Sequence, residues 1–242
     1  MAKRIAMWSG PRSLSTAMMR AWGNRKDTKV VDEPFYAYYL NTSELRHPAY
    51  EEIIASQSTD WQKVVNQLSK EPVEEAVFYQ KHMTHHMLPE IDLTWCSKLY
   101  NCFLIRSPLL VASSYEKKNQ LINANDIGIQ RQHEIYKKLI EITDRPVLIV
   151  DALDVLQYPE TVLKYICQQF EIPFTDRMLK WPKGKRRSDG VWASHWYKTV
   201  ENSTGFHTYS AQELQISDRG KNIAEECEDD YLAMWENRFI PR

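Results

Sequence analysis

The sequence predicts an α/β fold, in which a parallel sheet and its crossover helices form three layers. Short apolar runs rich in β-forming residues alternate with longer stretches of helical pattern along the 242 residues. This alternation is typical of a chain that crosses over a sheet after each parallel strand. No internal repeat, low-complexity tract or linker divides the chain, so we expect residues 1–242 to form a single domain.

The expected elements follow this alternation in order. Strands are predicted at 4–8, 28–31, 76–80, 101–105 and 146–150. Helices are predicted at 13–23, 48–56, 60–69, 108–117 and 160–170, with a last helix at about 221–236. The region 181–206 is polar, basic and aromatic with little periodicity, which indicates a loop or lid.

The composition is that of an ordinary globular protein, with 43% apolar and 26% charged residues. A net charge of −1 provides no general attraction for nucleic acid or for an anionic membrane surface. No apolar run approaches the roughly 18 residues that a membrane span requires, and residues 1–7 lack the pattern of a signal peptide. The cysteines form no CxxC pair. We therefore expect a cytoplasmic protein without nucleic-acid or membrane partners; the oligomeric state is not predicted.

Polar or ionisable residues follow one predicted strand after another. In open parallel sheets ligands bind beyond the carboxyl ends of the strands, so residues at these ends gather at one edge. The positions concerned are residues 9–12, Asp32 and Glu33, Lys81 and His82, Arg106, and Asp151. Five such positions at one edge predict a ligand site there.

The segment that joins the first strand to the first helix has the features of a phosphate-binding loop. It contains Gly10, Pro11, Arg12, Ser13, Leu14, Ser15 and Thr16. Backbone N–H groups at a helix start favour an anion, and an arginine adds a fork of donors. A turn followed by a serine N-cap is the alternative interpretation. The loop lacks the lysine and second glycine of a Walker A motif, which argues against ordinary ATP hydrolysis.

A second candidate phosphate site lies after the fourth predicted strand. Arg106 ends that strand, Ser114 follows eight residues later on the next helix, and Tyr115 comes directly after it. An arginine at a strand end and a hydroxyl about two turns into the helix can converge on one phosphate. A simple salt bridge at the strand end is the other interpretation of Arg106.

The two motifs together resemble those of the sulfotransferases of bacterial and cytosolic type that use 3′-phosphoadenosine 5′-phosphosulfate (PAPS). The 5′-phosphosulfate loop of that family reads P-[KR]-S-G-[ST]-[ST], and residues 11–16 match it except at Leu14. The family's 3′-phosphate motif has the spacing of Arg106 and Ser114. The resemblance implies a P-loop nucleotide-binding fold, PAPS as co-substrate and no metal. It also implies that Arg12 neutralises the 5′-phosphate oxygens as the sulfuryl group leaves.

The resemblance extends to a late loop and to the residues that would act on the acceptor. Lys183 and Gly184 resemble part of a family loop that covers the nucleotide; a solvated basic loop is the alternative. Glu33 resembles the base of some bacterial carbohydrate sulfotransferases, and His82 resembles the catalytic histidine of cytosolic ones. We expect both to lie in the site, with Lys81 contacting the departing phosphate oxygens.

The sequence leaves the acceptor and two other functions open. A zinc site formed by His82, His85 and His86 is a further interpretation of that histidine cluster. The insert 41–72 leaves little room for a large glycan, so we expect a small-molecule acceptor with a hydroxyl or amine. Aromatic residues expected to wall its pocket are Tyr36, Tyr38, Tyr39, Trp192, Trp196 and Tyr197. The alternative functions are a P-loop kinase or nucleotide hydrolase that uses ATP, with Asp151 serving Mg²⁺, and a non-catalytic nucleotide-binding relic, which Leu14 favours.

Overall fold

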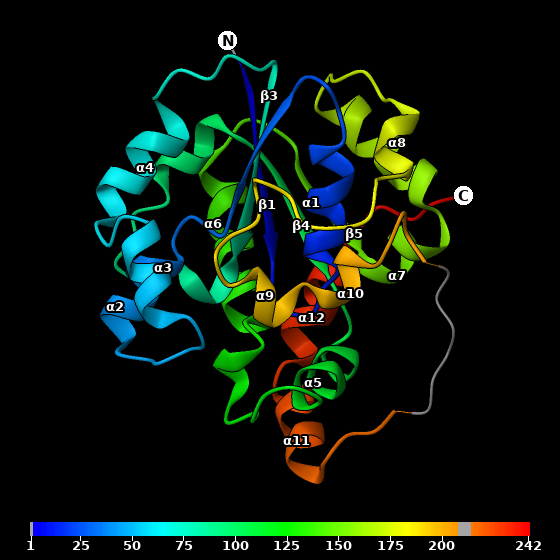
Figure 1. Ribbon diagram of the computed structural model, residues 1–242. Helices are drawn as coiled ribbons and strands as arrows, with labels where there is room; N and C mark the ends of the chain where they lie inside the picture. Colours follow the sequence, from blue (N-terminus) through cyan, green and yellow to red (C-terminus); the bar gives the residue numbers. More distant parts are fainter. Residues whose placement is uncertain (1, 208–213) are drawn as a thin grey trace.

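The computed structural model describes residues 2–207 and 214–242. Five parallel strands form one sheet with the order β2-β3-β1-β4-β5 (Figure 1). The strands are β1 (Lys3–Ser9), β2 (Thr28–Asp32), β3 (Val77–Met83), β4 (Tyr100–Ile105) and β5 (Val147–Asp151). The predicted α/β fold with a parallel sheet is therefore confirmed, and each predicted strand is found close to its expected place.

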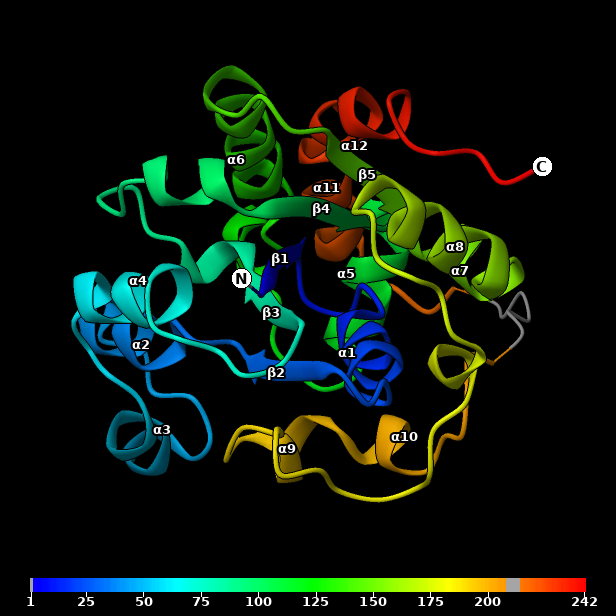
Figure 2. The ribbon, with the colours of Figure 1, turned by 90° about the horizontal axis from the view of Figure 1, so that it is seen from above.

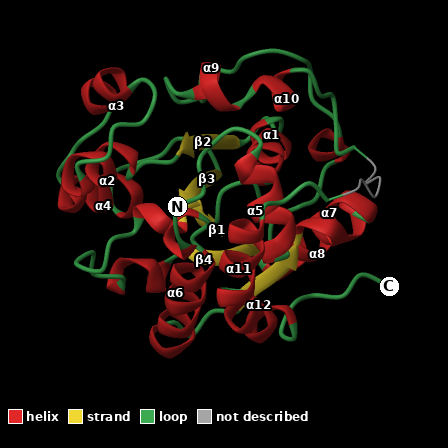
Figure 3. Ribbon diagram, turned by 90° about the horizontal axis from the view of Figure 1, so that it is seen from below, coloured by secondary structure: helices red, strands yellow, loops and turns green. Residues whose placement is uncertain are grey.

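Helices cover both faces of the sheet, so that the strands form the middle of three layers (Figures 2 and 3). One face packs against α1 (Ser15–Gly23) and α8 (Pro159–Gln169). The other packs against α4 (Trp61–Ser69), α5 (Pro108–Glu116), α6 (Ile129–Ile142) and α12 (Glu228–Trp235). Successive residues of β1 alternate between the two cores, with Ile5 and Met7 in the first and Ala6 and Trp8 in the second.

The remaining helices are short or lie outside these layers. They are α2 (Tyr36–Ser43), α3 (Tyr50–Ser56), α7 (Ala152–Gln157), α9 (Ala193–Trp196), α10 (Lys198–Glu201) and α11 (Asp218–Glu226). The region 181–206 is mostly loop, as expected, and an antiparallel bridge joins Lys180 to Gly205 near its two ends. No helix within the described ranges combines the length and the apolar character that a membrane crossing needs.

Helices α2 and α7 were not predicted, and α9 and α10 lie in the region expected to be loop. Two further failures of the helix predictions have identifiable reasons. The single last helix expected at 221–236 is wrong, because the chain forms α11 and α12 with a break at Cys227. Helix α6 was not predicted, since its buried stripe includes Gln132, which interrupts the apolar pattern. The Gln132 side chain donates to the backbone oxygens of Trp8 and Leu104, each at 3.1 Å. It thereby ties α6 to two strand ends.

Strand β3 runs further than predicted and places Lys81 and His82 on opposite faces of the sheet. His82 is buried, and its ring stacks on Trp8, a member of the core on the α4 and α6 face, with centroids 4.4 Å apart. Its Nε2 hydrogen-bonds to Oε1 of Gln80 at 3.1 Å. Burial lowers the pKa of His82 from 6.5 to about 3, so this imidazole is neutral. These contacts make His82 a core residue.

Substituting His82 tests this structural role. We expect His82→Ala to lower the free energy of unfolding by about 3 kcal/mol, because it leaves a cavity beside Trp8. The matched variant His82→Phe keeps the stacked ring but leaves Oε1 of buried Gln80 without its partner, so it should lose about 1–2 kcal/mol in urea unfolding, less than the alanine variant.

The same variants report on acid stability. Below pH 6.5 the unfolded chain protonates His82, whereas the native protein does not until about pH 3. This residue therefore lowers the free energy of unfolding as the pH is reduced from 6.5 to 3. His82→Phe should flatten the slope by about one proton. An alanine variant as stable as the phenylalanine variant would contradict the core role.

Candidate functional site

The carboxyl ends of the strands border a pocket of about 550 Å³. Residues 11–16 after β1, Glu33 after β2, Lys81 in β3 and Arg106 after β4 all line it. A second hollow of about 310 Å³ adjoins it and shares Leu14, Arg106 and Leu156 with it. The expected convergence of strand ends on one site is therefore found for four of the five strands, while Asp151 lines only the second hollow.

The loop after β1 has an unusual backbone. Arg12 has φ 59° and Leu14 has φ 67°, both in the left-handed region that glycine enters without strain. Leu14 therefore adopts a conformation that glycine adopts readily. Leu14 is the N-cap of α1, and its side chain has no oxygen that could accept hydrogen bonds from the first N–H groups of the helix. The helix start consequently faces the pocket without an internal cap, as an anion site requires.

Gly10 serves the loop in a different way from the one expected. It does not line the pocket. A Cβ at this position would lie 2.5 Å from the backbone oxygen of Ile127, so only glycine lets the two chain segments approach this closely. Its role is structural.

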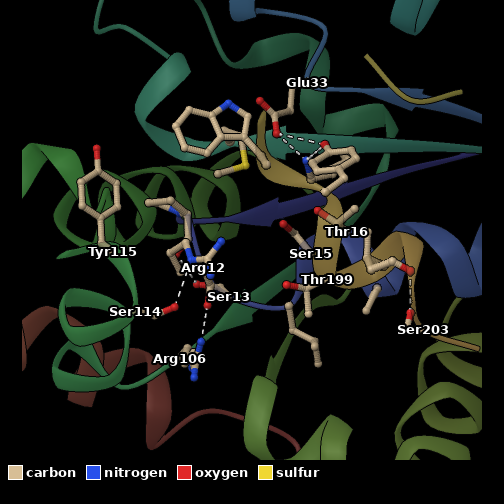
Figure 4. A pocket seen from close by; sticks show the side chains of 18 of the residues that line it. Arg12, Ser13, Ser15, Thr16, Glu33, Arg106, Ser114, Tyr115, Thr199 and Ser203 are labelled. Atoms are coloured by element: carbon tan, nitrogen blue, oxygen red, sulfur yellow. Dashed lines mark hydrogen bonds and ion pairs between the residues drawn. The ribbon is translucent and has the colours of Figure 1, made fainter. Parts of the chain in front are cut away.

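The two phosphate motifs meet in the pocket (Figure 4). Nε of Arg12 donates to Oγ of Ser114 at 3.0 Å, and Arg106 donates to the carbonyl oxygen of Arg12. Both guanidinium groups and the hydroxyl thus belong to one cluster, built from the loop after β1 and from α5 with the turn before it. Burial lowers the pKa of Arg12, because its charge is poorly hydrated. An anion bound here would compensate for the lost hydration.

Glu33 faces the same pocket from the other side (Figure 4). Its φ of 44° lies in the left-handed region, and its N–H donates to the backbone oxygen of Lys81 at 2.9 Å. A carboxylate held in a strained conformation at a pocket is typical of functional sites. Burial raises the pKa of Glu33, Lys81 opposes this shift, and Asp32 adds to it. Oε1 accepts from Lys81, whereas Oε2 has no hydrogen-bond partner within the described part of the chain.

Lys81 is saturated with partners. Its Nζ donates to Oδ1 of Asp32 at 2.9 Å, to Oε1 of Glu33, and to the hydroxyl of Tyr197 at 2.8 Å. An ammonium has three N–H donors, so none remains for another ligand. The expected contact between Lys81 and departing phosphate oxygens is therefore not supported, because the sequence could not reveal two carboxylates and a tyrosine around one amine.

Three other expected site residues lie outside the pocket. His82 is on the opposite face of the sheet, so the expectation that it shares the site with Glu33 is wrong. Lys183 and Gly184 do not line the pocket either, and Lys183 is exposed, as in the solvated-loop interpretation. Arg186, from the same basic stretch, donates to the carbonyl oxygens of Gly184 and Lys185 and so folds back on its own loop.

Other lining residues escaped the sequence analysis. His85 and His86 were assigned only to a zinc site, yet both line the pocket, and burial lowers the pKa of His85 to about 3. Among the described residues no group of three or more His, Cys, Asp or Glu side chains is arranged to hold a metal ion. The zinc interpretation fails because His82 points to the other face.

The late segment supplies one wall of the pocket, as its aromatic residues suggested. Of the six aromatics expected to wall an acceptor pocket, Tyr36, Trp196 and Tyr197 line it, whereas Tyr38, Tyr39 and Trp192 do not. Six more residues complete this wall: Thr199, Val200, Ser203, Gly205, Phe206 and His207. These six carry no motif, so only the folded chain reveals them.

Comparisons with known proteins identify the family to which the chain belongs. A family model described as a sulfotransferase domain matches residues 3–226. Two Arabidopsis thaliana proteins, named branched-chain-amino-acid aminotransferase-like proteins 1 and 2, are 36% and 35% identical over 202 residues, or 84% of this chain. The match spans only 36% of the length of each of these relatives.

Solved structures share the fold. The sulfotransferase domain from the curacin biosynthetic pathway has a TM-score of 0.60 at 15% identity and covers 93% of this chain and 97% of its own. A sulfotransferase from Alicyclobacillus acidocaldarius has a TM-score of 0.57 at 8% identity, with 99% and 98% covered. These structural similarities show a common P-loop-like fold. The family model shows the family, because it matches nearly the whole chain. The chain belongs to the sulfotransferase family.

Proposed function

We propose that this protein transfers a sulfuryl group from PAPS to the hydroxyl of a small molecule, in line and without a metal. The observation that carries the proposal is the 3.0 Å hydrogen bond between Arg12 and Ser114, which joins the two phosphate motifs in the pocket that also holds Glu33. A donor with anionic groups at both ends of one nucleotide matches two such cationic centres. Oε2 of Glu33, across the pocket, matches the need for a base that removes the proton of the acceptor hydroxyl.

The donor would be held at its two phosphate ends. The uncapped start of α1 and Arg12 would bind the 5′-phosphosulfate, with the hydroxyls of Ser13, Ser15 and Thr16 nearby. Arg106 and Ser114 would bind the 3′-phosphate. Because these groups belong to the sheet edge and to two helices that begin there, their positions are fixed before the ligand arrives.

Glu33 would act as the general base. Its Oε2 would take the proton from the acceptor hydroxyl while the acceptor oxygen forms its bond to sulfur. The bond between sulfur and the 5′-phosphate oxygen breaks in the same step, and its electron pair stays on that oxygen. Arg12 would stabilise the negative charge that appears there. The products are a sulfate ester and adenosine 3′,5′-bisphosphate (PAP), and Glu33 later releases its proton to water.

The charges of the pocket favour a hydroxyl acceptor over an amine. An amine must lose its proton before it can attack, and its ammonium form would approach Arg12 and Arg106. Glu33 cannot compensate for that repulsion fully, because Lys81 already pairs with it. The aromatic side chains of Tyr36, Trp196 and Tyr197 provide apolar contact area for the acceptor.

Two other activities receive less support. An ATP-dependent kinase or hydrolase would need a loop lysine, and Arg12 stands there instead. The name of the Arabidopsis relatives suggests an aminotransferase, but the match covers about a third of those proteins and the family model of this chain describes a sulfotransferase domain. We therefore propose neither an ATP-dependent activity nor an aminotransferase activity for this chain.

Arg106→Ala should weaken PAP binding about 10- to 150-fold, because it removes a charge-assisted contact worth about 1.5–3 kcal/mol. Isothermal titration calorimetry with PAP measures this loss. Lys183→Ala removes a cation outside the pocket and is the matched control, which should bind PAP as the wild type does. Tight binding of ATP with Mg²⁺ and none of PAP would instead favour a kinase or hydrolase.

Glu33→Gln should bind PAP within about twofold of the wild type and lose transfer by about 100-fold or more, since it removes the base but keeps the shape. Radiolabelled PAPS with a panel of small alcohols measures the rate. In the wild type the rate should rise with pH through the pKa of Glu33, which burial holds above its ordinary value of 4.5. His82→Phe should retain transfer; full activity of Glu33→Gln would remove Glu33 from the mechanism.

A further inference from the structure

We propose that Asp32 and Tyr197 are positioning residues with opposite effects on Glu33: Asp32 keeps it available as a base by sharing Lys81 with it, and the Tyr197 hydroxyl favours its ionised form. This inference rests on the proposed function, because it concerns the base of that reaction. Asp32 does not line the pocket, so it would act only through its neighbours. Tyr197 lines the pocket and contacts the same lysine.

The sheet register brings the charged groups together. Asp32 at the end of β2 pairs directly with Lys81 of the neighbouring β3. Their side chains form an ion pair of 2.9 Å, with each side chain 1% exposed. Glu33 is the next residue of the chain and turns into the left-handed region, which brings its carboxylate to the same ammonium. One buried cation therefore lies between two carboxylates.

The carboxylate of Asp32 also holds the late segment. The hydroxyl of Tyr197 donates to Oδ2 of Asp32 at 2.7 Å, and the backbone N–H of Gly190 donates to the same oxygen at 3.1 Å. Nε1 of Trp192 donates to the Tyr197 hydroxyl at 3.3 Å. Asp32 thus accepts bonds from β3 and from the wall that the acceptor would contact, and every oxygen of its carboxylate is engaged.

The balance of charge explains why the arrangement suits a base. If Glu33 were the sole partner of Lys81, the two would form a neutral ion pair, and the carboxylate would hold a proton poorly. With Asp32 present, two carboxylates share one ammonium, so the cluster gains from binding one proton. Lys81 and Tyr197 both contact Oε1 of Glu33, and Oε2 has no hydrogen-bond partner among the described residues.

The groups that face Glu33 come from each element packed against it. They are Asp32 of β2, Lys81 of β3, Tyr36 at the start of α2, and Tyr197 of the late segment. Gln57, after α3, donates its amide to the backbone oxygen of Glu33 at 3.1 Å and carries no charge. Asp32 is the only anion in this set within the described residues, so it is the group whose removal should change the proton affinity of Glu33 most.

The test measures the proton on Glu33 directly and needs no acceptor. Protein labelled with ¹³C at glutamate carboxyl carbons is titrated by NMR, with and without saturating PAP, and the Glu33 resonance is assigned by its absence in Glu33→Gln. Asp32→Asn keeps the shape but removes the anion, so the Glu33 midpoint should fall by about 1 pH unit or more. Tyr197→Phe removes a bond that favours ionised Glu33, so its midpoint should rise by a smaller amount.

Asp189→Asn is the matched control. Asp189 is a buried carboxylate that ties the same late segment to α1 through a bidentate pair with Arg20, including a 2.8 Å bond. Among the described residues its side chain bonds only to Arg20 and Arg186, while Gly190, the next residue, bonds to Asp32. Asp189→Asn should leave the Glu33 midpoint unchanged even where it lowers the melting temperature. Equal shifts in Asp32→Asn and Asp189→Asn, or a shift below about 0.3 unit in Asp32→Asn, would overturn the proposal.

The experiment separates this inference from the proposed function. A protein that does not bind PAP contradicts the sulfotransferase mechanism, whereas the titration of Glu33 in the free protein still decides whether Asp32 controls it. If Asp32→Asn does not fold, the Tyr197→Phe titration decides alone, because an unchanged or lowered midpoint contradicts the role of Tyr197 in the cluster.

Discussion

The ammonium of Lys81, buried at the end of a central strand, is the charge around which the site is organised. An isolated charge in such a place would cost several kcal/mol, so the surrounding chain must supply partners. Those partners are Asp32 from the neighbouring strand, Glu33 from the turn after it, and Tyr197 from a segment more than a hundred residues away. Compensating one cation therefore fixes the end of β2, the candidate base, and one wall of the pocket together.

The side of the pocket formed by residues 11–16 depends on backbone geometry more than on side-chain charge. Two non-glycine residues, Arg12 and Leu14, lie in the left-handed region, and the loop is tied to α5 through Ser114. Strain of this kind persists only where neighbouring contacts enforce it. Here the contact between Gly10 and the backbone of Ile127 and the bond from Arg106 to the Arg12 carbonyl supply that constraint.

The sequence was informative where local rules apply. Strand positions followed from apolar runs, and the rule that ligands bind beyond the carboxyl ends of parallel strands brought Arg12, Glu33 and Arg106 to one pocket. The sequence analysis misplaced His82 because β3 ends three residues later than expected, and adjacent residues of a strand lie on opposite faces of the sheet. The partners of Lys81, the buried Gln132 of α6 and the wall from Thr199 to Phe206 depend on contacts between distant segments, which no local pattern encodes.

Leu14 has a consequence beyond its backbone conformation. Its side chain borders both the main pocket and the smaller hollow against β5 and α12, and Leu156 does the same. A glycine there would relieve about 1–2 kcal/mol of conformational cost but would remove the apolar partition between the two spaces. Leu14 and Leu156 thus lie where the pocket meets the smaller hollow, so a substitution at either position changes the shape of both spaces.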